Sequence, residues 1–132
     1  MDLDKNGQMQ QENVDRGRYQ VSVVDQLSNR PVENARVRIS YTGDPDSVIE
    51  ELVTNSSGRT PVIELKTPPL EYSMEPVEQQ PYAEYTVQID AEGFESEEVA
   101  GSEVLPQVLS SQPVMLAARS VSEEYQRIVI PP

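Results

Sequence analysis

The chain has 132 residues, which is enough for one domain with a substantial core. Its 10 basic and 23 acidic residues give a net charge of −13, and this charge would repel nucleic-acid phosphates and anionic membranes. The chain has no Cys and no His, which excludes disulfides, zinc–thiolate sites and every acid–base or metal scheme that uses imidazole. No apolar run approaches the roughly 20 residues that span a bilayer, and no secretory signal is visible, so the localisation stays open.

The composition favours strands over helices. Eleven prolines are spread through the chain, and each removes a backbone donor and restricts the residue before it. Trp is absent and Phe occurs once, so the core must consist of Val, Ile, Leu and a few Tyr, a set that suits strands. Residues 1–16 are polar and show no periodic apolar face, which predicts a flexible polar tail.

The first two predicted strands cover residues 18–25 and 30–42, where apolar and polar residues alternate. The second of these runs has the clearest alternation in the chain. We therefore expect one of its faces to lie in the core and the other to face outward. The expected inward residues are Ala35, Val37, Ile39 and Tyr41, and the expected outward residues are Arg36, Arg38 and Ser40.

The remaining chain predicts further short strands separated by turns. Residues 43–47 and 55–58 predict turns, with Gly58 supplying a positive φ, and the proline-rich residues 67–81 predict a long loop packed on the sandwich. Seven short strands with such connections predict a two-sheet sandwich over residues 17–119, followed by an extended segment or the start of a linker at 120–132. The later strands are expected at residues 48–54, 60–65, 82–91, 95–105 and 114–118.

The sequence offers no constellation for covalent or acid–base catalysis. The two lysines, Lys5 and Lys66, are not in a Ser-x-x-Lys arrangement. Neighbouring glutamates such as Glu97 and Glu98 point to opposite faces of a strand, whereas glycosidase chemistry needs two carboxyl groups facing each other across a cleft. Solvated surface charge is the simpler explanation of the acidic pairs, so we expect no catalytic residue and no enzyme activity.

Two oxygen-rich clusters are the weak candidates for a metal site. Asp2, Asp4 and Asn6, followed by Gly7, match the start of a calcium loop, although Asn13 stands where that loop needs a bidentate Glu. A disordered acidic tail is the alternative. The second cluster, Asp44, Asp46 and Glu50, could hold a cation at a sandwich edge, but a capped turn explains the two aspartates more simply. No cofactor is predicted, and calcium is the only candidate.

Three spaced motifs resemble the carboxypeptidase regulatory-like domain. This resemblance implies an all-β, seven-stranded, two-sheet Greek-key sandwich of the transthyretin (prealbumin) type. It implies little about function, because such modules are appended to many enzymes and surface proteins. The motifs are Pro31-Val32-x-x-Ala35-x-Val37-x-Ile39, Thr54-x-x-x-Gly58 and Tyr85-x-Val87-x-Ile89-x-Ala91-x-Gly93-Phe94.

A narrower resemblance comes from residues 67–73, 80–82 and 128–132, which are similar to the N-terminal region of the spore cortex-lytic enzyme family of clostridia and their relatives. In that family this region precedes the parts that bind and cleave spore peptidoglycan, within a precursor matured by proteolysis at germination. The resemblance implies a non-catalytic accessory domain that aids folding, localisation or protein interaction in the spore or cell envelope. Its partners would be other domains of a longer protein or cell-wall and spore components. The alternative is a free-standing adhesion or carbohydrate-binding module of the bacterial cell envelope.

Arg36 and Arg38 stand out as two of only ten basic residues in an acidic chain. We expect them to pair with carboxylates of neighbouring strands. Uncharged neighbours would instead identify them as binding residues.

Overall fold

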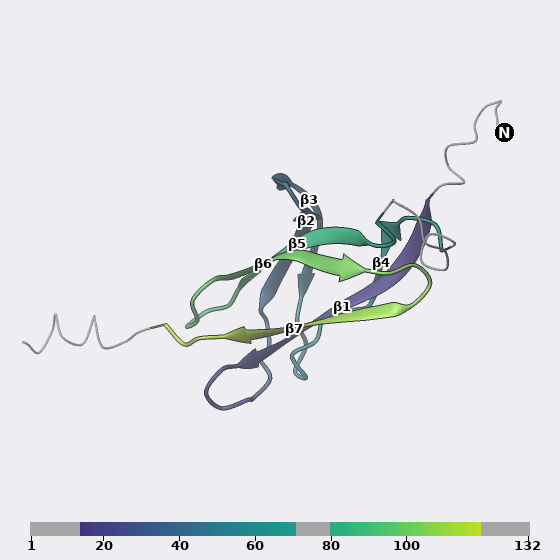
Figure 1. The fold of residues 1–132 in the computed structure, drawn as a ribbon. Helices are drawn as coiled ribbons and strands as arrows, with labels where there is room; N and C mark the ends of the chain where they lie inside the picture. Colours follow the sequence, from purple (N-terminus) through teal and green to yellow (C-terminus); the bar gives the residue numbers. More distant parts are fainter. Residues whose placement is uncertain (1–13, 71–79, 120–132) are drawn as a thin grey trace, which may run out of the picture.

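The computed structural model describes residues 14–70 and 80–119. Within these residues seven strands form two sheets (Figure 1). No helix in this part of the chain is long and apolar enough to cross a membrane. The sequence interpretations of residues 1–13, 71–79 and 120–132 lie outside the described residues. The strands are β1 (Asp15–Asp25), β2 (Arg36–Tyr41), β3 (Asp44–Val53), β4 (Ile63–Thr67), β5 (Ala83–Asp90), β6 (Glu97–Val104) and β7 (Leu109–Leu116).

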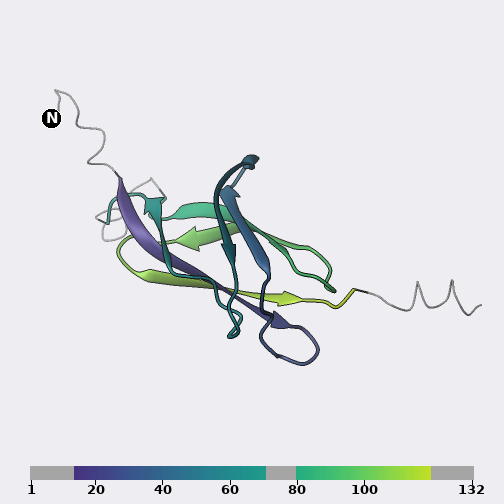
Figure 2. The same cartoon turned by 180° about the vertical axis from the view of Figure 1, so that it is seen from behind.

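The two sheets have three and four strands, in the orders β4-β1-β7 and β3-β2-β5-β6. β1 is antiparallel to β4 and parallel to β7, and β2 is antiparallel to both of its neighbours. Only β2–β3 and β5–β6 follow each other within one sheet; every other connection between consecutive strands passes to the other layer, which Figure 2 shows from behind. The expected all-β, seven-stranded, two-sheet Greek-key sandwich is confirmed.

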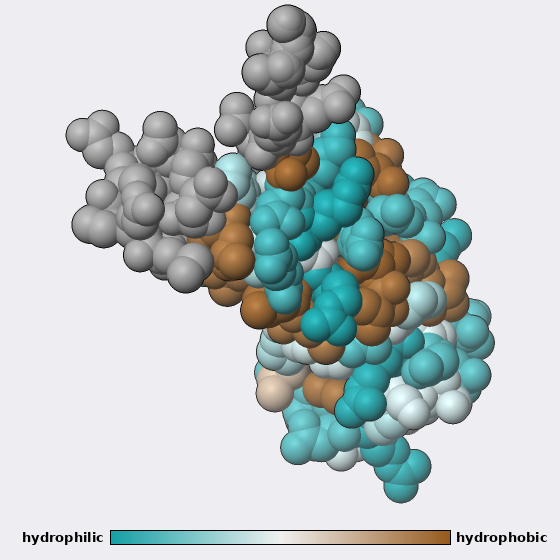
Figure 3. Space-filling view, turned by 90° about the vertical axis from the view of Figure 1, so that its right-hand side faces the viewer, coloured by the Kyte–Doolittle hydropathy of each residue, from teal (hydrophilic) through white to brown (hydrophobic). Residues whose placement is uncertain are grey.

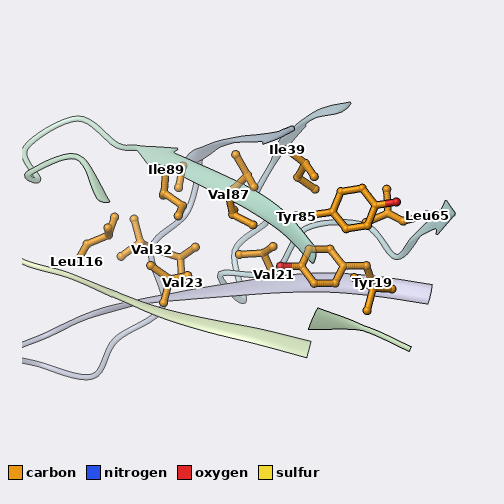
Figure 4. Packing of buried hydrophobic residues seen from close by; sticks show 14 residues of the cluster. Tyr19, Val21, Val23, Val32, Ile39, Leu65, Tyr85, Val87, Ile89 and Leu116 are labelled. Carbon is orange, nitrogen blue, oxygen red and sulfur yellow. The ribbon is translucent and has the colours of Figure 1, made fainter. Parts of the chain in front are cut away.

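The core lies between the two sheets and is made of the inward residues of the alternating strands (Figure 4). Period-2 alternation turns every second side chain of β1, β2 and β5 toward the opposite sheet, which explains why these three strands supply most of the core. Phe94 packs against the cluster. The buried apolar residues are Tyr19, Val21, Val23, Val32, Ala35, Val37, Ile39, Leu65, Tyr85, Val87, Ile89, Val104, Val114 and Leu116.

Buried hydroxyl groups tie the connections to the strands. Thr54 Oγ1 accepts a hydrogen bond from the Ala35 backbone N–H at 2.8 Å and donates to the Val32 carbonyl at 2.7 Å. Thr60 Oγ1 accepts from the Val21 backbone N–H at 3.0 Å. Each of these hydroxyls satisfies backbone groups that would otherwise be buried without a partner.

The C-terminal end of β2 differs from the expected alternation. Ser40 was expected to face outward and is buried, whereas Tyr41 was expected in the core and is 42% exposed. The pairing of β2 with β3 shifts register between Ile39 and Ser40 and again between Ser40 and Tyr41. The pairing of β2 with β5 has no such shift, and Tyr41 lies opposite the buried Tyr85, so Tyr41 keeps the inner side of the sheet and is exposed at the edge of the core.

The predicted turn at residues 43–47 is wrong. The hairpin needs only Thr42 and Gly43, with Gly43 at φ 91°, and Asp44 already pairs with Tyr41 as the first residue of β3. A two-residue loop with a glycine at positive φ is the usual connection of two antiparallel strands. The two aspartates that suggested a turn, Asp44 and Asp46, are therefore strand residues.

Three other strands begin at residues that differ from the predicted ones. The strand expected at residues 60–65 begins only at Ile63, since Pro61 has no N–H for the ladder. The strand expected at 114–118 begins at Leu109, where it aligns with Arg18 of β1. β1 begins at Asp15, before the expected domain boundary at residue 17, because Asp15 and the residue after it pair with β4. Pairing with a distant strand extends these elements beyond what local alternation indicates.

β6 has a bulge at Gly101. Tyr85 pairs with Ser102 and Val87 pairs with Val99, so two residues of β6 oppose one residue of β5, and Gly101 has φ 74°. The opposing residue is Thr86. It is buried, and its hydroxyl lies 3.1 Å from that of Thr42.

The β6–β7 connection lies close against β1. A Cβ atom on Gly17 would lie 2.1 Å from the Leu105 carbonyl oxygen, so only glycine permits this approach. Leu105 and Val108 in the connection are 38% and 46% exposed. Seen from the end at which β1 begins, apolar side chains interrupt a mostly polar surface (Figure 3).

Candidate functional site

The outer side of the four-stranded sheet carries a group of charged side chains, which we call the arginine face: Arg36, Arg38, Glu51 and Asp90. Burial of Val37 and Ile39 on the inner side of β2 turns both arginines outward. In the strand register, Arg38 lies opposite Glu51 of β3, and Arg36 lies opposite Asp90 of β5. Three strands therefore bring these four charges together.

The ion pair on this face joins Arg38 to Asp90, which is not its direct cross-strand neighbour. Arg38 Nη2 lies 3.6 Å from Asp90 Oδ2, with the two side chains 45% and 37% exposed. The Ser96 hydroxyl donates a hydrogen bond to Asp90 Oδ1. The expected pairing with a neighbouring carboxylate is confirmed for Arg38, whereas Arg36 makes no ion pair with another residue of the described part.

Two open hollows adjoin the arginine face and share Asp90. One, of about 350 Å³, extends from Arg38 over β5 toward β6. The other, of about 530 Å³, lies at the opposite side of Asp90, around Arg36. Its lining combines charged, amide and apolar groups: Asn34, Arg36, Asp90, Ala91, Glu92, Phe94 and Arg119.

Arg119 reaches the larger hollow from the other sheet. Its backbone N–H donates to the Gly93 carbonyl at 2.8 Å, and its Nη2 donates to the Phe94 carbonyl at 3.5 Å. The Glu95 N–H donates to the Ala117 carbonyl at 2.8 Å. These bonds fix the chain after β7 to the β5–β6 connection. Nothing in the local sequence around Arg119 indicates this contact.

The larger hollow offers charges of both signs. The Asp90 carboxylate already pairs with Arg38. The side chains of Arg36 and Glu92 have no hydrogen-bond or ion-pair partner among the described residues. A guanidinium group binds a carboxylate or phosphate through two parallel hydrogen bonds, and a free carboxylate accepts from a cationic or hydroxyl group. This arrangement can therefore recognise a polar surface that carries both kinds of group.

The predicted cation sites are not assembled on the arginine face. Asp44 lies opposite Tyr41 and Glu50 lies opposite Ile39 across an irregular part of the β2–β3 pairing, and these carboxylates form no group that could hold a metal ion. The structure therefore does not bring Asp44, Asp46 and Glu50 together, and it groups no three carboxylates elsewhere in the described part closely enough for a metal ion. The other candidate ligands, Asp2, Asp4 and Asn6, lie outside the described residues.

No protein-family model and no curated protein matches the chain. Solved structures with a similar fold include a catechol 1,2-dioxygenase from Acinetobacter radioresistens, with a TM-score of 0.55 and 10% identity over 83% of this chain and 54% of that one. An (S)-allantoin synthase has a TM-score of 0.54 and 17% identity over 80% and 42% of the two chains. A 3-chlorocatechol 1,2-dioxygenase from Rhodococcus opacus 1CP has a TM-score of 0.53 and 13% identity over 85% and 64%.

The chain thus spans between 42% and 64% of these three proteins. At such identities the likeness shows the fold alone, and the expected transthyretin-like β-sandwich is confirmed at that level. The proteins that share the fold have varied functions, so the function has to be argued from the surface of this chain.

Proposed function

We propose that this chain is a non-catalytic accessory module that binds a partner through the arginine face. The observation that carries the proposal is the Arg36 guanidinium, which has no partner among the described residues and lies beside a hollow of about 530 Å³. The charged groups there are placed on an exposed sheet surface, which suits recognition. Acid–base catalysis would instead need titratable groups held in a site that shifts their pKa toward the working pH.

The position of the hollows supports recognition of a surface. The smaller hollow lies on the outer side of the four-stranded sheet and the larger one lies beside it at the β5–β6 connection, while the space between the sheets is filled by apolar side chains. A partner with mixed charges would bind Arg36 through a carboxylate or phosphate and Glu92 through a cation or hydroxyl group. Interactions of this kind contribute more to specificity and association rate than to affinity.

We further propose that this chain is part of a longer protein that resembles the spore cortex-lytic enzymes. The module would aid the folding, localisation or protein interaction of that longer protein. The support is the similarity of residues 67–73, 80–82 and 128–132 to the N-terminal region of that family. The partner would then be another domain of the longer protein or a component of the spore or cell wall.

Two parallel assays with the full chain test the proposal. The first measures co-sedimentation with purified spore cortex and with vegetative cell wall, and the second measures binding to the protein region encoded next to this chain. We expect binding in one assay, and we expect the double variant Arg36→Ala with Arg38→Ala to lose it. The matched control, Arg30→Ala with Arg59→Ala, removes the same charge from exposed positions outside the arginine face and should bind normally.

Different outcomes would reject different parts of the proposal. Equal binding by the two double variants would reject the arginine face as the contact surface. Release of soluble peptidoglycan fragments by the purified chain would reject a non-catalytic role. An adjacent coding region without a cortex-lytic hydrolase would reject the narrower family context and favour a free-standing envelope module.

A further inference from the structure

A second surface feature lies where the edges of the two sheets meet. A cleft of about 160 Å³ lies between β3 of the four-stranded sheet and β4 of the three-stranded sheet. We call it the tyrosine cleft. Its apolar floor includes Tyr85 and Leu65, which lie at one end of the core in Figure 4. The lining residues are Arg16, Tyr41, Ile49, Glu50, Glu64, Leu65, Lys66 and Tyr85.

The ring of Tyr41 is held at this cleft by a rigid support. It stacks on Tyr85 with a centroid distance of 5.6 Å and an interplanar angle of 30°. Tyr85 is buried, and its hydroxyl donates to the Lys66 carbonyl at 2.6 Å, which ties the ring to β4. Tyr41 lies opposite Tyr85 in the β2–β5 register, on the same face of the sheet, and is 42% exposed at the edge of the core. A partly exposed aromatic ring is thus fixed at the cleft.

Four charged side chains border the same cleft. Glu50 comes from β3, Glu64 and Lys66 come from β4, and Arg16 comes from β1. None of them forms an ion pair with another described residue. The cleft therefore combines an aromatic surface with unpaired hydrogen-bond acceptors and donors of both charges.

We propose that the tyrosine cleft binds one ring of a neutral oligosaccharide. A sugar ring has an apolar C–H face that packs on an aromatic ring and hydroxyl groups at its edge that both donate and accept hydrogen bonds. The carboxylates of Glu50 and Glu64 accept from such hydroxyls, and Arg16 and Lys66 donate to them. A volume of about 160 Å³ equals the space of roughly five water molecules, which suits a single ring and leaves the rest of the chain outside.

Other ligand classes fit this combination less well. A polyanion would be opposed by the net charge of −13 and by two carboxylates at the cleft. A purely apolar ligand would leave the four charged groups desolvated without partners, which is costly. The proposal concerns a different surface from the arginine face, so it goes beyond the partner binding proposed above.

The test is binding of three neutral trisaccharides, cellotriose, chitotriose and maltotriose, to the full chain by isothermal titration and saturation-transfer NMR. We expect at least one of them to bind and Tyr41→Ala to weaken that binding about tenfold or more. Tyr41→Phe keeps the ring and should change the affinity less than Tyr41→Ala. Glu50→Gln should weaken it through the loss of a charged acceptor.

The matched control is Leu27→Ala, which removes another exposed apolar side chain, 90% exposed, from the β1–β2 connection and should bind normally. Circular dichroism in the near ultraviolet verifies that each variant is folded. The proposal is overturned if none of the three trisaccharides binds, or if folded Tyr41→Ala binds as tightly as the wild type. The Arg36→Ala, Arg38→Ala variant should keep saccharide binding, which separates this test from that of the arginine face.

Discussion

The hydroxyl of Tyr19 lies 2.6 Å from Ser102 Oγ, and this buried hydrogen bond joins β1 of one sheet to β6 of the other. Ser102 in turn donates to Gln112 Oε1 at 2.7 Å, on β7, so that Tyr19 acts as the donor to Ser102. The polar link lies beside a core that is otherwise held by apolar contact. It fixes the position of one sheet relative to the other at the end where β6 and β7 meet.

The two buried tyrosines Tyr19 and Tyr85 should make the free energy of unfolding fall at alkaline pH. Burial raises the pKa of Tyr19 to about 12, and burial together with the neighbouring Tyr41 raises the pKa of Tyr85 to about 12. Both tyrosines hold their protons more tightly when folded, so their contribution is complete below about pH 10 and is lost between about pH 10 and 12. For Tyr19 the loss is about 3 kcal/mol. Urea unfolding across this pH range measures it, and Tyr19→Phe should flatten the slope; an unchanged slope would contradict the assignment.

Removal of two buried hydroxyls, those of Thr54 and Ser40, should have different effects on the free energy of unfolding. Thr54→Val leaves the Ala35 N–H and the Val32 carbonyl without their partner and should cost about 1–3 kcal/mol in the free energy of unfolding. Ser40 Oγ is buried and has no hydrogen-bond partner among residues 14–70 and 80–119, so Ser40→Ala should be neutral or stabilising. Denaturant unfolding of both variants compares the two effects. A larger loss of unfolding free energy for Ser40→Ala than for Thr54→Val would show that the Ser40 hydroxyl makes a stabilising interaction.

Two glycines at positive φ differ in their surroundings. Gly58 has φ 75°, and a Cβ there would lie 2.5 Å from the Val23 carbonyl oxygen, whereas Gly93 has φ 86° and open space around it. Gly58→Ala should therefore cost about 3 kcal/mol or more through backbone strain and overpacking. Gly93→Ala should cost only the strain, about 1–2 kcal/mol. Thermal unfolding tests the order, and equal losses would show that crowding at Gly58 relaxes at little cost.

The ion pair of the arginine face should matter little for stability. Both partners are more than one-third exposed, so Arg38→Ala should lower the free energy of unfolding by less than about 1 kcal/mol. Arg36→Ala should have a similar or smaller effect, since Arg36 has no ion pair in the described part. Urea midpoints of both variants test this. A loss of several kcal/mol would mean that the binding assays with these variants report unfolding.

Calcium should not stabilise the chain. A ligand that binds only the folded state raises the unfolding temperature with concentration, and Asp44, Asp46 and Glu50 form no metal-binding group in the described part of the chain. We therefore expect equal unfolding temperatures in excess calcium and in a chelator. A calcium-dependent increase would contradict this prediction. Loss of that increase in Asp2→Asn with Asp4→Asn would locate the site in the N-terminal residues.

The candidate site was predictable only in part. Arg36 and Arg38 could be placed together on the outer side of a strand from alternation alone. Their surroundings could not: Asp90 and Arg119 come from elements far along the chain, and Arg119 reaches the hollow through backbone bonds to the β5–β6 connection. Alternation placed Tyr41 on the inner side of β2 but could not show that its ring lies at the exposed edge of the core. The exposed ring of the tyrosine cleft was therefore missed.

The amino-acid sequence by itself determined the strand content, the two-sheet class and the inner faces of β1, β2 and β5. These depend on side-chain polarity at every second residue, which is a local property. Only the tertiary structure decided strand order, the true ends of β4 and β7, and the positions of Tyr41 and Arg119. Those features depend on which distant backbone groups remain to be paired once the apolar faces have met, and the local sequence does not specify that partner.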